Sequence, residues 1–294
     1  MRKEPYLIAE IGCNHCGDFK IASQMVRVAK MYCGVDAVKF QKRTVRELLS
    51  EEQYNSPHPN PGSSYGQTYG AHRDFLEFSI EQHCGLQRLC RDIGAQYMTS
   101  VWDKTAAKEI LSLGPATIKI GSPSNLDFDL VDYICENHPG DIHVSLGMTT
   151  RHEEKLIVDF LTKKGRAKDT VLYACTSGYP VPLEQVCLLE ITRLRKEYGS
   201  IVGDIGFSGH HHGIVVDIAA YALGARYIER HFTFDHTWKG TDHSSSLEPD
   251  DMRQLRQNLY STHKALTYKP MEILAIEQEQ RQKMKQKMKI VRSQ

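Results

Sequence analysis

Ile205-Gly-Phe-Ser-Gly-His210 and Tyr227-Ile-Glu-Arg-His231 are the two pieces of sequence that decide the fold of this chain. Each belongs to a short apolar segment, expected at residues 201–207 and 226–232, and a histidine stands at or just beyond the end of each segment. A glycine-flanked loop and an amphipathic stretch lie between them, which predicts the order strand, loop, helix, strand. Strands joined in this way are parallel, and ligands bind at their carboxyl edge. The sequence therefore places both imidazoles where ligands bind.

The same alternation extends along the rest of the chain. Working outward, we expect the other strands at residues 6–12, 35–41, 96–100, 116–120, 142–145 and 170–175. Helices are expected at residues 18–34, 81–93, 103–113, 127–137, 151–164, 183–198, 213–225 and 250–266. Eight strands, each followed by a helix, predict a (β/α)8 TIM barrel in the α/β class.

The barrel is expected to form one domain over residues 1–268. Residues 42–72 are rich in Pro, Gly, Ser, Asn and Tyr, so we expect a long loop after the second strand, acting as an ordered lid. A surface insertion without order is the alternative. Residues 269–294 are expected to form a basic helical tail.

Composition narrows the class of protein. The formal net charge of +1 argues against nucleic-acid binding, and the Lys/Arg-rich tail is interpreted as a solvated helical end. Of the eight cysteines, Cys13 and Cys16 form the only close pair, as expected for a reduced, cytoplasmic protein. No apolar run reaches roughly 18 residues, so neither membrane insertion nor secretion is indicated.

Polar side chains gather at the predicted strand ends. The positions are Glu10, Lys39, Gln41, Ser100, Lys119, Ser122, Ser145, Ser177, Tyr179 and Ser208. Lysines and hydroxyls suit an anion with a phosphate, and a lysine within an apolar strand is costly unless an anion meets it. A structural ion pair inside the barrel mouth remains the alternative for Lys39 and Lys119.

His210 and His231 are the candidate metal ligands. Two imidazoles leave coordination positions for water and substrate oxygen, which favours exchangeable Mn²⁺ or Mg²⁺ over a closed zinc site. His211 and His212 are interpreted as loop packing or as groups that support the ligands.

Seven spaced motifs show a resemblance to a known family. They are Ile8-Ala-Glu-Ile-Gly-Cys-Asn-His-Cys-Gly17, Asp36-Ala-Val-Lys-Phe-Gln41, Ile118-Lys-Ile-Gly-Ser122, Ser145-Leu-Gly-Met148, Tyr179-Pro180, Gly206-Phe-Ser-Gly-His210 and Ile228-Glu-Arg-His-Phe-Thr233. Over residues 6–246 the chain resembles the catalytic barrel of the N-acetylneuraminate (sialic acid) synthase family. That family condenses phosphoenolpyruvate with an aldose such as N-acetylmannosamine, assisted by a divalent metal, typically Mn²⁺, with Mg²⁺ or Co²⁺ as further possibilities.

The resemblance implies a role for each candidate residue. His210 and His231 would hold the metal, and Glu10 would act at the reacting centre. Lys39, Lys119 and the serines at positions 100, 122, 145, 177 and 208 would surround phosphoenolpyruvate. Gln41, Tyr179 and Asp242 would face the sugar.

The chain also departs from the family pattern. Ser124 stands where a carboxylate is frequent, and Gly209 stands where Asp is frequent, which leaves open an acceptor other than N-acetylmannosamine. We expect the family's small C-terminal domain to be absent, so that the 42–72 loop with its Tyr54, Tyr65 and Tyr69, the tail, or the second subunit of a homodimer closes the site.

Three other functions remain open. One is a related synthase that makes an octulosonate-type sugar acid or uses a phosphorylated hexose. The second is a catalytically silent barrel that binds sugar or a partner. The third is nucleic-acid binding through the tail, which the composition disfavours.

Overall fold

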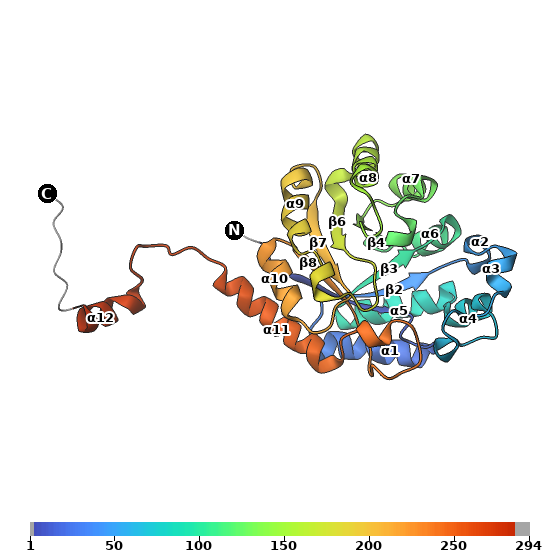
Figure 1. The fold of residues 1–294 in the computed structure, drawn as a ribbon, viewed down its shortest axis with the longest axis horizontal. Helices are drawn as coiled ribbons and strands as arrows, with labels where there is room; N and C mark the ends of the chain where they lie inside the picture. Colours follow the sequence, from blue (N-terminus) through green and yellow to red (C-terminus); the bar gives the residue numbers. More distant parts are fainter. Residues whose placement is uncertain (1–2, 286–294) are drawn as a thin grey trace.

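Eight parallel strands close into a barrel in sequence order, so the (β/α)8 prediction is confirmed (Figure 1). This computed structural model describes residues 3–285. The strands are β1 Tyr6–Gly12, β2 Ala37–Lys42, β3 Gln96–Val101, β4 Thr117–Ile120, β5 Asp141–Ser145, β6 Thr170–Cys175, β7 Asp204–Gly209 and β8 Tyr227–His231. The last strand pairs with the first, with His231 in register with Glu10.

Helices cover the outside of the barrel. They are α1 Phe19–Arg27, continued by a π-helical turn at Val28–Tyr32, then α5 Ile80–Ile93, α6 Lys104–Leu111, α7 Phe128–Asn137, α8 Arg151–Lys163, α9 Leu189–Tyr198, α10 Val215–Leu223 and α11 Pro249–Ala265. The start of α5 shows how local sequence sets such a boundary. Ser79 and Gln82 form a capping box there, and the helix ends at Gly94 with φ of 74°.

The helix expected at residues 183–198 begins later than predicted. Residues Leu183–Gln185 form only a 3₁₀ turn, and the regular helix starts at Leu189. Between them Cys187 has φ of 54°, a left-handed conformation that interrupts any continuous helix. The apolar periodicity therefore identified the helix but extended it too far toward the N-terminus.

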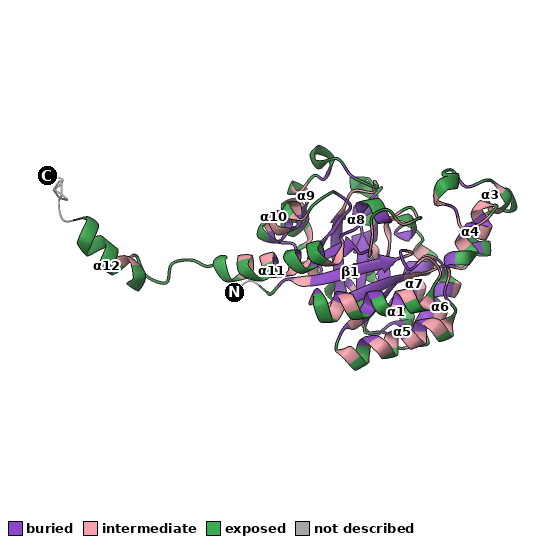
Figure 2. Cartoon of the chain, turned by 90° about the horizontal axis from the view of Figure 1, so that it is seen from below, coloured by how far each residue is buried: buried purple, intermediate pink, exposed green. Residues whose placement is uncertain are grey.

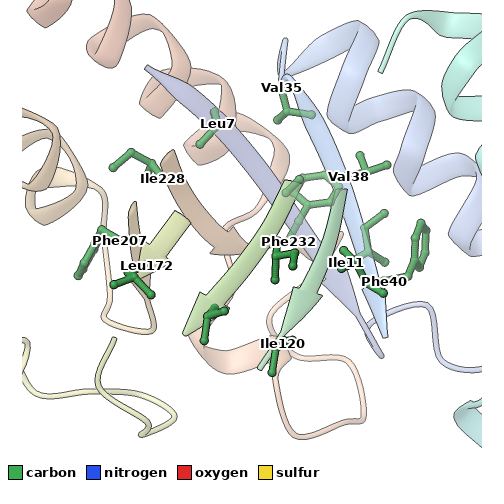
Figure 3. Close-up of a cluster of buried hydrophobic side chains, with 14 of the residues drawn as sticks. Leu7, Ile11, Val35, Val38, Phe40, Ile120, Leu172, Phe207, Ile228 and Phe232 are labelled. Atoms are coloured by element: carbon green, nitrogen blue, oxygen red, sulfur yellow. The ribbon is translucent and has the colours of Figure 1, made fainter. Parts of the chain in front are cut away.

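Alternation along the strands divides the barrel into two apolar layers. Leu7 and Ile11 of β1 belong to the large cluster that includes buried residues of the surrounding helices, whereas Ile8 packs with Met98 and Tyr173 in a smaller cluster. Figure 3 shows the larger cluster, and Figure 2 shows buried strands within partly exposed helices. Each fully buried aliphatic or aromatic side chain contributes roughly 1.5 to 3 kcal/mol. The apolar side chains fill these two layers, and the polar side chains lie at the carboxyl ends of the strands.

The long segment after β2 is ordered, as expected, but it also contains short helices that its composition did not predict. It contains α2 Val45–Leu48, α3 Glu51–Asn55 and α4 Tyr69–Leu76. The Pro- and Gly-rich composition concealed these helices, although Ser50 and Gln53 form a capping box at the start of α3.

Two of the three tyrosines of this segment pack against other residues of the chain. Tyr54 lies against Gly70 and donates a hydrogen bond to Asp74. The Tyr65 ring stacks on Phe75 with centroids 5.0 Å apart, and its hydroxyl donates to the carbonyl of Lys239. Residues 43–76 are therefore joined to the loop between β8 and α11.

The C-terminal part of the described chain leaves the barrel. Helix α12, Ala275–Met284, lies apart from the barrel in two views and is largely exposed (Figures 1 and 2). Residues 286–294 of the predicted tail lie outside the described residues. The domain boundary at residue 268 stays a prediction. Within residues 3–285 no helix is long and apolar enough to cross a membrane.

A buried ionic cluster fixes the loop after β7. The fully buried Arg230 donates to Asp217 Oδ2 at 2.5 Å and to the carbonyls of His211 and Gly213 at 2.6 and 2.8 Å. The packing interpretation of His211 is therefore confirmed, whereas His212 is exposed. This cluster ties β8, α10 and residues 210–213 together.

Replacing Asp217 with Asn leaves the Arg230 charge buried without a counter-charge. Breaking one side of a buried ion pair costs about 3 to 5 kcal/mol, so the urea midpoint of unfolding should fall sharply. Asp159→Asn is the matched control, because Asp159 pairs with Lys155 on the surface and its loss should cost less than about 1 kcal/mol. An Asp217→Asn protein as stable as the parent would contradict this role.

Candidate active site

The strand register brings the predicted polar side chains to one edge of the barrel. Glu10 lies opposite Lys39 on β2 and His231 on β8, and Ser208 lies opposite Glu229. One cavity is lined by Glu10, Lys39, Gln41, Ser100, Lys119, Ser122, Ser145, Tyr179, Ser208, His210 and His231. Gly12 makes room there, because a Cβ at this position, where φ is 54°, would lie 3.0 Å from Gln41 Nε2 and 3.2 Å from Glu10 Oε1.

Two lysines and two glutamates form the charged floor of this cavity. Lys39 Nζ lies 2.8 Å from Glu10 Oε2 and 3.6 Å from Glu229 Oε1, and Lys119 Nζ lies 3.1 Å from Glu229 Oε2. All four side chains are at least nine-tenths buried. The ion pairs that formed the alternative interpretation of the lysines are thus present. The lysines nevertheless line the cavity as well, beside Ser100, which accepts a hydrogen bond from Lys39 Nζ at 2.8 Å.

The electrostatics follow from burial and from these neighbours. Burial alone would raise the pKa of the Glu229 carboxyl, but Lys119 and Lys39 outweigh it and hold that pKa well below its usual range. Burial lowers the pKa of Lys119, which Glu229 opposes and the nearby Lys39 charge reinforces. Glu229 is therefore a carboxylate at neutral pH, and it pairs with both lysines.

The two histidines lie side by side above this floor. Their ring centroids are 5.5 Å apart, and His210 Nδ1 lies 3.1 Å from the carbonyl oxygen of Thr176, which leaves Nε2 for a ligand. Burial lowers the pKa of His210 to about 3, with the nearby His231 adding to the effect, so this imidazole is neutral at physiological pH. His231 Nδ1 is buried without a hydrogen-bond partner, and it lies 3.9 Å from Asp242 Oδ2.

The donor set fits an open divalent site rather than a closed one. A buried imidazole nitrogen that lacks a partner, beside a second neutral imidazole and a carboxylate, suits a cation. Within residues 3–285 no group of three or more His, Cys, Asp and Glu side chains is already arranged to hold a metal. Any ion held by His210 and His231 would take further ligands from water or substrate.

Two predicted residues do not line the main cavity. Ser177 lines an adjacent cavity between α8 and α9. Its hydroxyl still lies beside that of Ser122, because a Cβ at Gly147 would be 2.4 Å from Ser177 Oγ and 2.6 Å from Ser122 Oγ. Asp242 stands at the rim beside His231.

Glu229 is the functional residue that the sequence interpretation missed. It was not among the residues expected at the strand ends, yet it pairs with both lysines and accepts a hydrogen bond from Ser208 Oγ at 3.0 Å. The signal was present. Glu229 stands two residues before His231 in an apolar strand, so alternation puts both side chains on the same face. Cys175 and Trp102 also line the cavity.

The two departures from the family pattern have local explanations. Gly209 has no space for a side chain, because a Cβ there would lie 2.8 Å from both the His211 and the Phe207 rings. The buried Ser124 donates a hydrogen bond to the Trp102 carbonyl at 2.9 Å and lines a neighbouring cavity.

Together, the barrel and its charged, histidine-bearing mouth define a (β/α)8-barrel enzyme with a site for an anionic substrate. The chain belongs to the NeuB family, whose sequence profile matches residues 25–270. It is 36% identical over 261 residues to the N-acetylneuraminate-9-phosphate synthase of Homo sapiens, spanning 89% of this chain and 71% of that protein.

Other relatives extend the comparison. The N,N'-diacetyllegionaminic acid synthase of Legionella pneumophila is 30% identical over 257 residues, spanning 86% of this chain and 71% of that one. The crystal structure of the N-acetylneuraminic acid (sialic acid) synthetase of Leptospira borgpetersenii, in complex with citrate, superposes with a TM-score of 0.81 at 25% identity, covering 97% of this chain and 94% of that chain. The resemblance seen in the sequence is thus confirmed at the level of the family.

Replacing Glu229 with Gln should destabilise the protein and increase its response to anions. Lys119 would then lose its carboxylate partner and Lys39 would keep only Glu10, a loss of about 3 to 5 kcal/mol. Added phosphate would replace part of the missing charge. Thermal unfolding should show a lower midpoint, and phosphate should raise that midpoint more than it does in the parent. Glu109→Gln, which breaks a half-exposed pair with Lys42, should do neither. If Glu229→Gln unfolds at the same midpoint as the parent, with and without phosphate, Glu229 is not the counter-charge of the two lysines.

Proposed function

We propose that this protein condenses phosphoenolpyruvate with an aldose to give a nonulosonic, sialic-type acid and phosphate. The observation that carries the proposal is the pair of buried lysines at the barrel mouth, next to two adjacent imidazoles. Membership of the NeuB family supports it, because relatives carry the names of sialic, legionaminic and pseudaminic acid synthases.

The lysines and hydroxyls bind phosphoenolpyruvate. Its phosphate and carboxylate are met by Lys39, Lys119 and the cavity serines, with Ser177 contributing from the adjoining cavity. Glu229 keeps both lysines charged and oriented before the substrate arrives, because it lies within 4 Å of each ammonium. The anion therefore binds to lysines that are already in position.

The chemistry joins C3 of the enol to the aldehyde carbon of the sugar. As this C–C bond forms, the aldehyde oxygen gains a proton and C2 becomes cationic. Water then adds to C2, and the resulting tetrahedral intermediate releases inorganic phosphate by C–O cleavage. Glu10, held by Gln41 Nε2 at 2.7 Å and by Lys39, is placed to accept the proton of that water. Gln41, Tyr179 and Asp242 contact the sugar.

His210 and His231 would hold the divalent metal, Mn²⁺ in first place, with Mg²⁺ and Co²⁺ as alternatives. When bound, such an ion supplies Lewis acidity for the sugar aldehyde. Residues 43–76 would serve as the cover that keeps bulk water from C2, and the hydrogen bond from Tyr65 to the Lys239 carbonyl supports this role. We further propose a cytoplasmic homodimer whose partners are phosphoenolpyruvate and the aldose rather than nucleic acid or membrane.

Phosphate release is the decisive measurement. The full chain, incubated with phosphoenolpyruvate, Mn²⁺ and a panel of aldoses, should release phosphate only when both substrates are present, with a product of the summed mass. A related octulosonate-type synthase would be recognised by a shorter product. If phosphoenolpyruvate binds but no aldose leads to phosphate release, the result would favour a sugar-binding barrel without activity.

The histidine variants test the metal site separately. His210→Ala and His231→Ala should each lose most of the Mn²⁺ affinity measured by calorimetry and almost all turnover, because each removes one of two protein ligands. His212→Ala is the matched control, since this exposed histidine lies in the same loop and should bind Mn²⁺ like the parent. Parent-like Mn²⁺ binding by both ligand variants would refute the assignment.

A further inference from the structure

One buried tyrosine of the barrel interior contacts a cavity lysine, and the chemistry described so far does not use it. Tyr173 of β6 is fully buried and belongs to the smaller apolar cluster, with Ile8 and Met98. The ammonium of Lys119 lies over its ring, with Nζ 3.4 Å from the ring centroid. A cation over the face of an aromatic ring is attracted by the negative potential of that face.

Lys119 has fewer polar partners than its neighbour Lys39. Lys39 Nζ contacts two carboxylates and the Ser100 hydroxyl. Within the described part of the chain, Lys119 Nζ donates one hydrogen bond, to Glu229 Oε2 at 3.1 Å, and Glu229 is shared with Lys39. Burial lowers the pKa of Lys119, and the nearby Lys39 charge lowers it further. The ring face of Tyr173 therefore adds an attraction for the ammonium that the carboxylates do not provide.

Two neighbours fix the orientation of this ring. The Tyr173 hydroxyl lies 2.8 Å from His143 Nδ1, within hydrogen-bond distance. Gly206, in register with Tyr173 on β7, leaves the space that the ring occupies, because a Cβ there would lie 2.6 Å from Tyr173 Cε1. His143 is itself in register with Lys119. The ring is thus held at its hydroxyl and packed closely beside the β7 backbone.

Neither member of the tyrosine–histidine pair brings a second charge to Lys119. Burial lowers the pKa of His143 well below its usual range, and the Lys119 charge acts in the same direction, so the imidazole is neutral at physiological pH. Burial raises the pKa of the Tyr173 hydroxyl well above its usual range, so the phenol stays protonated. The contact between Lys119 and Tyr173 is therefore one between a cation and a neutral ring.

We propose that Tyr173 is a positioning residue for phosphoenolpyruvate, because its ring face holds the Lys119 ammonium in place at the cavity floor. The inference rests on the proposed function, in which Lys119 meets the phosphate or carboxylate of phosphoenolpyruvate. An ammonium that contacts both a carboxylate and a ring face loses less conformational freedom when the anion binds. Tyr173 acts through the lysine, since Lys119 lines the cavity and Tyr173 does not.

Binding of phosphoenolpyruvate in the absence of any aldose tests this role. Calorimetry should give a Kd about 10- to 30-fold higher for Tyr173→Leu than for the parent, the factor expected for a desolvated cation–π contact. Tyr173→Phe should stay within about threefold of the parent, because it keeps the ring face. Both variants should unfold at a lower temperature than the parent, because both leave His143 without its hydrogen-bond partner. Affinity and stability are thereby separated.

The two KM values of the complete reaction give a second readout. Tyr173→Leu should raise KM for phosphoenolpyruvate by about 10- to 30-fold and leave KM for the aldose unchanged. A purely structural role would reduce the number of active molecules, which lowers kcat and leaves both KM values as in the parent.

Tyr97→Leu is the matched control. Tyr97 is another buried strand tyrosine, and its hydroxyl lies 2.8 Å from His83 Nδ1, so its pairing resembles that of Tyr173 with His143. Among residues 3–285 no lysine or arginine lies over its ring. Its variant should lose stability and bind phosphoenolpyruvate like the parent. If Tyr173→Leu also binds like the parent, the positioning role is overturned and the proposed function is not.

Lysine NMR tests the contact independently of the proposed function. An aromatic ring shifts the signals of protons near its face upfield, so the ε-methylene of Lys119 should give an upfield-shifted signal in protein with isotope-labelled lysine. The signal should persist in Tyr173→Phe and disappear in Tyr173→Leu, and its absence from Lys119→Met would assign it.

The outcomes of the two measurements are distinguishable. If the parent binds no phosphoenolpyruvate, the proposed function fails, whereas the expected NMR pattern would still support the contact between ring and ammonium. Absence of a shifted lysine signal from the parent would overturn the inference even if the protein condensed its substrates. If Tyr173→Leu does not fold, the parent's NMR signal and the Kd of Tyr173→Phe decide, and a Kd more than about tenfold above the parent's would overturn the inference.

Discussion

The burial of two lysine charges opposite two glutamates is the constraint on which the rest of the site depends. An ammonium in the interior of a barrel loses its hydration, and only well-placed carboxylates offset that loss. Glu229 satisfies both lysines from one position on β8, and Glu10 adds a second carboxylate from β1. The two ammonium groups are therefore held in place by ion pairs before any ligand binds.

The order of the barrel was predictable because each strand end combines two independent signals. An apolar run of strand length gives the element, and the polar residue after it gives the edge, as at Lys39 and Lys119. The register then follows from closure, which brings Glu10 beside His231 although they lie at opposite ends of the barrel sequence. The candidate residues on separate strands could thus be gathered into one cavity from sequence alone.

What the sequence did not reveal depends on contacts between distant side chains. Glu229 was visible only as one acid in a strand, because its two lysine partners lie on β2 and β4. The helices of residues 43–76 were hidden because Pro, Gly and Ser dominate the middle of that segment. Tertiary contacts, such as Tyr65 on Phe75 and Tyr54 on Gly70, hold the segment together. The cavity that Ser124 lines lies between this segment and the strand ends, so no local pattern could indicate it.

The pairing of β1 with β8 has a consequence for how the chain folds as it is synthesised. Glu10 emerges from the ribosome first, but its neighbour His231 and the shared carboxylate of Glu229 emerge only after seven strands are complete. Until then Lys119 has no carboxylate partner among the contacts described for it, so a partly made barrel would bury an uncompensated charge. The ion-paired lysines that line the cavity thus penalise premature compaction. The pairing of β1 with β8 is therefore a late, non-local and cooperative event in folding.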